Sequence, residues 1–424
     1  MMRKFLWVAG AILVVLYTVK ASLPSSAQST VPAEQATSSA AQTTASAVQT
    51  TADAEFPSQD LDGSAEVSGR SGEGDEKISR QSSRIRDAID GKGLEVLPFA
   101  TPVLLDGGSK KRKKLAEISG LTHSPIRSDL LWAIADGGEG RLFGIHYLVQ
   151  AEEIERIQEF QVDDPKAFDW EALASFEHGG EGFLLIADTG ANTNPPPRYL
   201  RLLIVPEPLP EMAQKMGGIP VLWEGRIRTQ ELEDSKEFKE ANDIEAVAVD
   251  SQRWEILLIR KRKKDQQVAV VDLPEGFPKD KSRQVVDLPS IAELPWSDLR
   301  LPAPKPDEAG RPGFQYRFRT SPTGLDLHSV GPTARAVLLT YRHAYLFSRG
   351  SNQPWSEALQ QDPRQIPLPF RFKGDDYPRG VSAQLILPQR EAVAFDSSGN
   401  HLFVASEASS EVGWRLLYLA EQSP

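Results

Sequence analysis

The sequence contains no cysteine among its 424 residues. This absence excludes disulfide bonds, thiolate metal sites, a cysteine nucleophile and a lipoprotein anchor. Positive charge is also scarce, because 48 lysine and arginine residues stand against 59 aspartate and glutamate residues and give a net charge of −11. Nucleic-acid binding needs a basic surface, so we expect no nucleic-acid partner.

Two common catalytic signatures are missing as well. No GxSxG segment is present, which argues against a serine hydrolase built on a nucleophile elbow. The six histidines form no HExxH pair, so a zinc protease of that type is not supported. Any hydrolytic chemistry must therefore rest on other residues.

A long apolar run lies near the N-terminus, from Phe5 to Val19, directly after Arg3 and Lys4. Fifteen helical residues span about 22 Å, less than the roughly 30 Å hydrocarbon core of a bilayer. We interpret residues 1–21 as a signal peptide, cleaved near Ser25-Ser26-Ala27, or as an uncleaved signal anchor. Both interpretations predict a periplasmic or other extracytoplasmic location, and the anchor would hold the protein at the inner membrane.

Residues 22–90 are rich in serine, threonine, alanine and glutamine. Such a composition cannot bury enough apolar surface to offset the entropy of the chain. We expect a disordered linker there, followed by one folded domain over residues 91–424.

The folded part contains an internal repeat. An acidic or small polar residue precedes a short apolar strand, a second apolar strand follows, and a polar turn ends the pair. The first strands of the five copies read EISGLTHS from Glu117, DWEALASF from Asp169, DIEAVAVD from Asp243, TGLDLHS from Thr323 and REAVAFD from Arg390. Short runs of this composition, bounded by Gly, Pro, Asp and Asn, are typical of strands. The repeat predicts an all-β fold, a β-propeller with five four-stranded blades.

The two ends of the repeat predict how the ring closes. The fifth copy stops after three strands, and a lone apolar run, LEVLPFATPVLL from Leu94, precedes the first copy. If this run supplies the missing outer strand, no long sheet edge is left exposed. Two alternatives stay open: a sixth blade within Pro289–Gly313, which otherwise is an inserted loop, and a two-sheet sandwich.

Carboxylates recur at equivalent places of the repeat. In a propeller the start of each first strand and the end of each second strand lie on one face, around the mouth of the central channel. We predict Glu171 and Glu245 as catalytic carboxylates there. The predicted metal ligands are Asp136, Asp169, Asp188, Asp243, Asp326 and Glu391.

Crowded carboxylates repel one another, and Ca²⁺ relieves this because it accepts six to eight oxygen ligands in irregular geometry. Ca²⁺ is therefore the predicted cofactor. Two other interpretations remain: the acids join neighbouring blades by binding backbone amides, or they act as a titrating acid–base pair without a metal.

Basic residues accompany the acids in two runs, Lys110–Lys114 and Arg260–Lys264. At the predicted mouth, Arg260, Arg262 and Arg342 could orient an anionic substrate, and His343 could act as a catalytic acid or base. The alternative is that these residues are solvated loop groups that balance the nearby acids.

Several segments together resemble a family of exported bacterial proteins similar to the esterase-like domain of phytase-type propellers. The segments are ISGL, LLWAIADGG, DWEALA, LLIADTGAN, DIEAVAVD, TGLDLHS and EAVAFDSSGNHLFVASEAS, which run from Ile118 to about Glu407. The resemblance implies a β-propeller and hydrolysis of an ester or phosphoester. The chain departs from the family pattern at Ala172 and at Ala191-Asn192, where the family carries acids, and at its first turn, Ala135-Asp136-Gly137-Gly138.

Two functions follow from these observations. The first is a metal-supported hydrolase that acts on a small or anionic ester or phosphoester. The second is a non-catalytic binding propeller of the cell envelope, with an envelope protein as its partner.

Overall fold

The computed structural model describes residues 103–105, 115–136, 140–148, 153–164, 169–190, 197–209, 218–232, 235–261, 266–277, 282–301, 321–330, 333–341, 343–366, 368, 389–407 and 415–420. All of them belong to the compact unit Arg70–Pro424. The predicted signal segment and linker lie outside the described residues. Within those residues, no helix has both the length and the apolar character needed to cross a bilayer.

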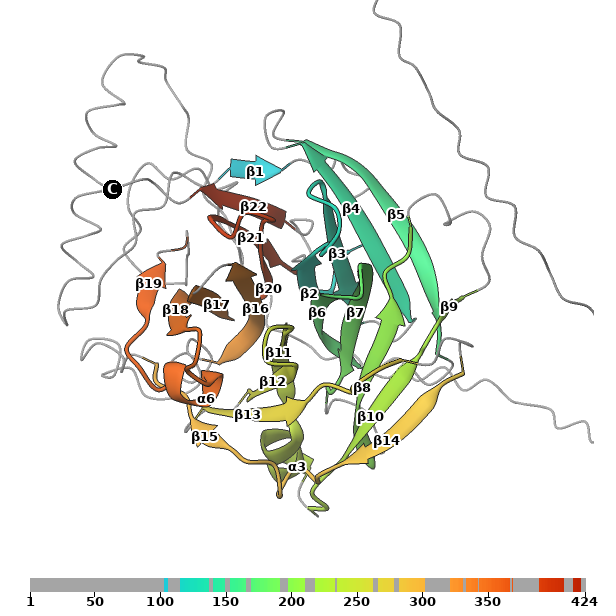
Figure 1. The fold of residues 1–424 in the computed structure, drawn as a ribbon, viewed down its shortest axis with the longest axis vertical. Helices are drawn as coiled ribbons and strands as arrows, with labels where there is room; N and C mark the ends of the chain where they lie inside the picture. Colours follow the sequence, from blue (N-terminus) through green and yellow to red (C-terminus); the bar gives the residue numbers. More distant parts are fainter. Residues whose placement is uncertain are drawn as a thin grey trace, which may run out of the picture. The chain divides into compact units, whose positions relative to one another are not determined.

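The strands form five sheets arranged in a ring (Figure 1). Blade one contains β2 (Ile118–His123), β3 (Leu130–Ala135), β4 (Arg141–Leu148), β5 (Glu153–Asp163) and the short β9 (Ile219–Pro220). Blade two contains β6 (Trp170–His178), β7 (Glu181–Asp188), β8 (Tyr199–Pro206), β10 (Trp223–Arg228) and β14 (Gln284–Leu288). Blade three contains β11 (Ile244–Asp250), β12 (Glu255–Arg260), β13 (Gln267–Asp272) and β15 (Ser297–Asp298).

The last two blades complete the ring. Blade four contains β16 (Pro322–Val330), β17 (Thr333–Thr340), β18 (Ala344–Gly350) and β19 (Arg364–Ile366). Blade five contains β20 (Arg390–Phe395), β21 (His401–Ser406), β22 (Arg415–Ala420) and β1 (Val103–Leu105). The fold is a five-bladed β-propeller.

The ring closes between the two ends of the repeat, as the sequence predicts. Strand β1 pairs antiparallel with β22, with Val103 opposite Tyr418 and Leu105 opposite Leu416. Figure 1 shows β1 beside β22 at the outer edge of blade five. The N-terminal strand therefore covers the edge that the C-terminal strand would otherwise expose.

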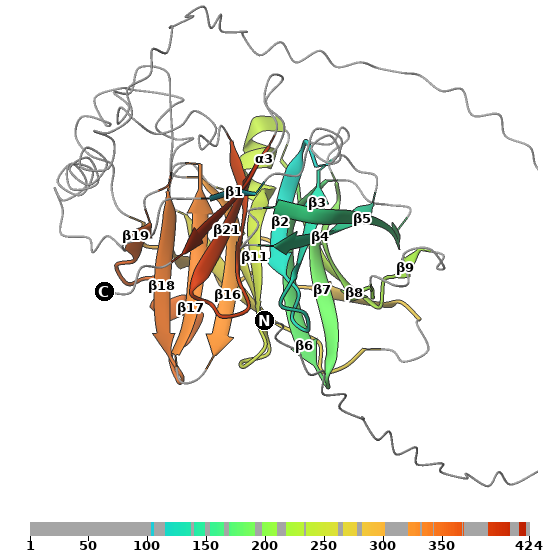
Figure 2. The ribbon, with the colours of Figure 1, turned by 90° about the horizontal axis from the view of Figure 1, so that it is seen from above.

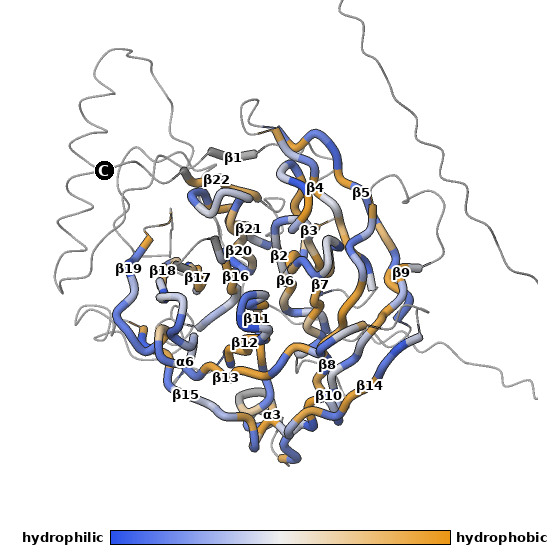
Figure 3. The backbone as a smooth tube through the Cα atoms, in the orientation of Figure 1, coloured by the Kyte–Doolittle hydropathy of each residue, from blue (hydrophilic) through white to orange (hydrophobic). Residues whose placement is uncertain are grey.

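Each pair of neighbouring blades encloses a hydrophobic cluster. Along β11, for example, Val247 packs toward blade two, whereas Ala246 and Ala248 pack toward blade four. Strands buried on both faces need apolar residues at every position, which is why these runs do not alternate with polar residues. In Figure 3, β13 is mostly hydrophobic, and the outer strand β15 is hydrophilic.

The innermost strands β2, β6, β11, β16 and β20 surround the centre and leave little room between them (Figure 1). A Cβ atom added to Gly120 would lie 2.8 Å from the backbone nitrogen of Leu173 on the neighbouring blade. Small residues at such positions allow the inner strands to approach one another closely.

The segment after β13 does not add its next strand to blade three. Strand β14 returns to blade two and pairs in parallel with β10, and β15 then supplies the outer strand of blade three. The described part of Pro289–Gly313 thus belongs to blade three and to no sixth sheet. Helix α3 (Ser235–Asn242) connects β10 to β11 at the end of the propeller where the inner strands begin (Figure 2). We call this end the mouth.

Candidate functional site

Every inner strand carries a register shift immediately after its first residue. A bulge of this kind leaves one residue unpaired and changes the direction of its side chain. The five bulged residues are Ser119, Glu171, Glu245, Thr323 and Glu391. The mouth therefore carries three carboxylates and two hydroxyl groups at equivalent positions of the ring.

Two neighbouring blades bring three carboxylates together. Glu171 of blade two and Asp243 and Glu245 of blade three each offer an oxygen, and these oxygens lie within 4.8 Å of one another. Glu171 and Asp243 are half-buried, and Glu245 is buried. Among the described residues, this is the group whose spacing could hold a metal ion.

Burial and crowding together raise the pKa of carboxyl groups at the mouth. Burial raises the pKa of Glu171 well above its usual range, and repulsion from Glu245 and Asp169 adds to the effect. Burial also raises the pKa of Glu391, with a further contribution from Glu245. The mouth without a bound cation therefore favours protonated carboxyl groups.

Two further acids at the mouth titrate near neutral pH. Burial raises the pKa of Asp136 to about 6, with contributions from Glu117 and Asp169. Burial likewise raises the pKa of Glu407 to about 7, with a contribution from Asp136. Both groups follow the second strand of a blade, where Asp136 bonds to Glu117 and Glu407 bonds to Gln389 through their backbones.

Lys261 supplies positive charge to this cluster. Its ammonium group pairs with Glu245 and lies 5.3 Å from the ring centroid of Tyr341. Burial lowers the pKa of Lys261, but attraction to Glu245, Tyr341 and Glu391 outweighs it, and the pKa is raised overall. Lys261 therefore remains charged and neutralises part of the carboxylate cluster.

Asp169 directly precedes β6, and Asp188 is the last residue of the neighbouring strand β7. Asp188 accepts a hydrogen bond from the backbone N–H of Asp169 at 2.7 Å and pairs with Arg201. Gly190 packs so closely against the carboxylates of Asp169 and Glu171 that a Cβ atom there would collide with both. Asp188 thus holds the backbone of Asp169 in place, and the carboxylate of Asp188 forms an ion pair with Arg201.

Asp326 lies further along its inner strand, four residues beyond the start of β16. Its carboxylate accepts a hydrogen bond from the backbone N–H of Phe395 on blade five at 2.7 Å. The structure thus does not bring it into the group of Glu171, Asp243 and Glu245. Two hydroxyl groups join other blades: Ser119 donates to the Trp170 carbonyl at 2.6 Å and Thr189 to the Ile244 carbonyl at 2.5 Å.

The position of Asp326 predicts a pH-dependent contribution to stability. Burial raises its pKa to about 7, although backbone N–H groups of Phe395 and Leu327 oppose this shift. Since the native state keeps a proton that the unfolded chain releases, this residue favours the folded state at low pH, and that stability is lost as the pH rises through about 7. Asp326→Asn should raise the free energy of unfolding at pH 8 by about 2–4 kcal/mol, and should give no gain at pH 4.

Urea denaturation of both proteins at pH 4, 6 and 8 measures this difference. Asparagine keeps an oxygen that can accept the Phe395 N–H, so the comparison isolates ionisation. His123 and His328 have pKa values lowered chiefly by burial, and they make both proteins more stable as the pH rises toward about 6.5. Parallel pH profiles of the two proteins would refute the prediction.

The predicted basic residues occupy different places. The guanidinium of Arg260 donates to the Ile291 carbonyl at 2.7 Å and stacks on Trp296, 3.8 Å from the ring centroid. The imidazole Nδ1 of His343 lies 3.1 Å from the side-chain amide of Gln365 on β19, the outermost strand of blade four. Arg262 and Arg342 lie outside the described residues.

Sequence reasoning places Lys261 near the mouth but gives it no role, and it does not name Tyr341. Lys261 belongs to the basic run, but only the pairing of Ile244 with Arg260 places it beside Asp243, to whose carbonyl its backbone N–H donates at 3.1 Å. Tyr341 follows β17 at the corresponding point of blade four. The positions of both residues depend on the register of the strands, which the sequence alone does not give.

Neither a described protein family nor a curated protein matches this chain. Solved structures are similar to it in fold. The major allergen Mala s 1 of Malassezia sympodialis is 8% identical with a TM-score of 0.42, over 77% of this chain and 99% of that one. Regucalcin, a calcium-binding protein of Agrobacterium tumefaciens strain C58, is 11% identical with a TM-score of 0.33, over 77% of this chain and 97% of that one.

Proposed function

We propose that the propeller binds Ca²⁺ at its mouth through Glu171, Asp243 and Glu245, and hydrolyses an ester or phosphoester there. The observation that carries this proposal is the convergence of three carboxylate oxygens within 4.8 Å from two blades. The further acids around them provide the negative charge that a divalent cation would balance.

The donor set suits calcium. Two oxygens bound to one Ca²⁺, each about 2.3–2.6 Å from it, are at most about 5 Å apart, which agrees with the spacing of these carboxylates. The group contains only carboxylate oxygens, and hard cations prefer such ligands. Mg²⁺ demands a nearly ideal octahedron at about 2.0–2.1 Å, which such a loose group supports poorly.

The chain's own residues supply the remaining functions. A bound Ca²⁺ would polarise the substrate oxygen. Asp136 and Glu407 have pKa values of about 6 and about 7, so their carboxyl groups can accept or donate a proton near neutral pH. Lys261 stays protonated and can attract an anionic substrate.

We also propose that the propeller works outside the cytoplasm. The support is the N-terminal sequence, in which Arg3 and Lys4 precede the apolar run Phe5–Val19 and a polar linker follows. An uncleaved segment would tether the propeller to the inner membrane.

Thermal unfolding of the full-length chain tests the cation site. The melting temperature should fall in EDTA and recover with Ca²⁺ but not with Mg²⁺. A ligand at 100 times its Kd stabilises by about 2.7 kcal/mol, which corresponds to a shift of roughly 4 °C for a folded domain of this size. A melting temperature that responds to neither EDTA nor Ca²⁺ would contradict a cation site.

Glu245→Gln tests the chemistry. This variant should lose both the Ca²⁺ response and the hydrolysis of any ester or phosphoester that the wild-type protein turns over in Ca²⁺. Glu255→Gln is the matched control, because Glu255 lies at the start of β12, at the other end of the propeller, and pairs with Arg253. A Ca²⁺ response without turnover of any such substrate would favour the non-catalytic envelope propeller.

A further inference from the structure

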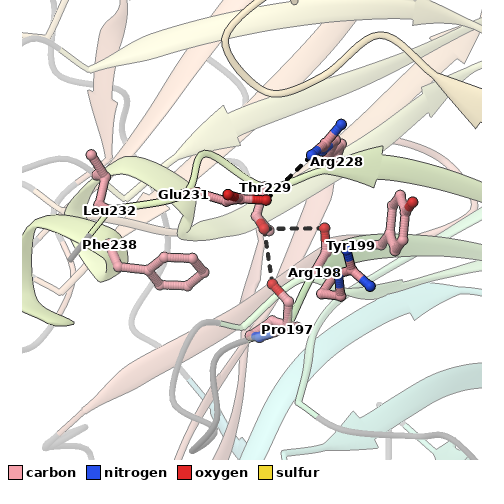
Figure 4. A pocket seen from close by; sticks show the side chains of 8 residues that line it. All are labelled: Pro197, Arg198, Tyr199, Arg228, Thr229, Glu231, Leu232 and Phe238. Carbon is pink, nitrogen blue, oxygen red and sulfur yellow. Dashed lines mark hydrogen bonds and ion pairs between the residues drawn. The ribbon is translucent and has the colours of Figure 1, made fainter. Parts of the chain in front are cut away.

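A cavity of about 560 Å³ lies beside the mouth, between the end of blade two and helix α3 (Figure 4). It is lined by Pro197, Arg198, Tyr199, Arg228, Thr229, Glu231, Leu232 and Phe238. Pockets for small molecules typically enclose about 300–1,000 Å³ and combine apolar walls with a few polar groups. The volume of this cavity lies within that range, and its lining is about equally divided between apolar and polar groups.

Hydrogen bonds hold the walls of the cavity in place. Tyr199 and Arg228 are directly paired at the ends of β8 and β10. The hydroxyl of Thr229 donates to the Pro197 carbonyl at 2.9 Å and to the Arg198 carbonyl at 3.1 Å. These bonds keep the two strand ends together where the cavity opens.

The opposite wall is tied to the same strands through Asn242, the fully buried last residue of α3. Its side chain accepts a hydrogen bond from the Gln230 backbone N–H at 2.8 Å and donates to the Gln230 carbonyl at 3.1 Å. Helix α3 thereby holds Phe238 in the cavity wall, and in Figure 4 its ring points toward Thr229 and Pro197. The cavity is therefore formed before any ligand arrives, which lowers the entropy cost of binding.

The charged side chains lie at the rim of the cavity, and buried side chains form its base. Phe238 and Thr229 are buried at the base, whereas Arg198, Tyr199 and Arg228 are exposed at the rim. Arg228 pairs with Glu231 at 3.2 Å, but the two side chains are 63% and 79% exposed, and such pairs contribute little and exchange readily. Within the described part of the chain, no acidic group pairs with Arg198.

We propose that this cavity binds a small organic anion that carries a phosphate or carboxylate group on an apolar, planar body. The two guanidinium groups present paired N–H donors that match the oxygens of either anion. Phe238, Leu232 and Pro197 offer apolar surface to the body of the ligand. This proposal is independent of the cation site and of hydrolysis at the mouth.

Phenyl phosphate, which joins both features in one molecule, is the probe for a calorimetric titration of the full-length chain in EDTA. Its binding should be saturable and at least about tenfold tighter than that of inorganic phosphate or phenol, because each of these supplies only one of the two features. Benzoate in place of phenyl phosphate distinguishes a carboxylate from a phosphate as the preferred anion.

The double variant Arg198→Gln/Arg228→Gln should weaken phenyl phosphate at least about tenfold. Arg253→Gln is the matched control, since Arg253 lies before β12 at the opposite end of the propeller. Both replaced arginines are exposed, so we expect the fold to persist, and the single variant Arg228→Gln serves if the double variant unfolds. Equal affinity of wild type and variant, absence of saturable binding, or equally tight inorganic phosphate would overturn the proposal.

Discussion

Replacing Asp250 with alanine should lower the free energy of unfolding by about 3–5 kcal/mol, because it leaves a buried guanidinium without its counterion. Asp250 accepts hydrogen bonds from Arg349 at 2.6 Å and from the indole N–H of Trp355 at 2.9 Å. All three residues are essentially inaccessible to solvent. Asp250 ends the inner strand of blade three, whereas Arg349 and Trp355 belong to the blade four segment. The lost contact therefore joins two blades of the ring.

Urea denaturation of the variant measures this change, and a parallel thermal scan should show a drop in melting temperature of roughly 4–7 °C. Asp362→Ala is the matched control. Asp362 pairs with Arg300 at 2.7 Å, but the side chains of Arg300 and Asp362 are 61% and 64% exposed. Exposed pairs contribute at most about 1 kcal/mol. Similar losses in the two variants would contradict the claim that burial of the pair determines its effect.

The sequence predicts the architecture well because each blade begins with strands of similar amino-acid composition. Segments such as DIEAVAVD are continuous apolar runs with an acidic start, and in the structure they are inner strands buried on both faces. The closure of the ring was also predictable, since a fifth unit with three strands and an isolated N-terminal run are complementary. What the sequence does not reveal is β14, because its parallel pairing with β10 depends on a long return of the chain.

The candidate site was only partly predictable, because acids at similar sequence positions have different structural roles. Glu245 and Glu391 are bulged residues that face the mouth, but Asp326 lies further along its strand and bonds to Phe395 of the next blade. Asp188 is the last residue of its apolar strand, whereas Asp136 comes directly after one, and Arg201 of the adjacent strand neutralises Asp188. Where a bulge falls, and which residue of another strand an acid contacts, depend on the strand register. The spacing of the acids along the sequence does not determine that register.

These differences separate two roles that the sequence left as alternatives. Asp326 joins blades through a backbone N–H, and Ser119 and Thr189 do so through backbone carbonyls. Glu171, Asp243 and Glu245 instead each hold one oxygen within 4.8 Å of the others. Mutual approach raises the energy of ionised carboxylates, so this arrangement favours a bound cation or a shared proton.

Lys261→Met should increase the affinity for Ca²⁺ at least about tenfold, which corresponds to about 1.4 kcal/mol. The Lys261 ammonium pairs with Glu245, one of the three carboxylates proposed to hold the cation. A divalent ion must therefore either displace this ammonium group from Glu245 or bind beside it and be repelled by it. Two unit charges about 4 Å apart near a protein surface interact by about 4 kcal/mol. Removal of the competing charge lowers this cost.

The same variant should be less stable than wild type at pH 8 in EDTA and should regain stability when Ca²⁺ is added. Attraction to Lys261 lowers the pKa of Glu245, Glu391 and Glu407, although burial raises all three overall. Without the ammonium their ionised forms become costlier in the folded state, so stability declines more steeply as the pH rises. Calorimetric Ca²⁺ titration and melting curves in EDTA measure the two effects, with Lys261→Arg as the variant that keeps the charge. Unchanged or weaker Ca²⁺ binding in Lys261→Met would mean that Lys261 organises the carboxylates and does not compete for them.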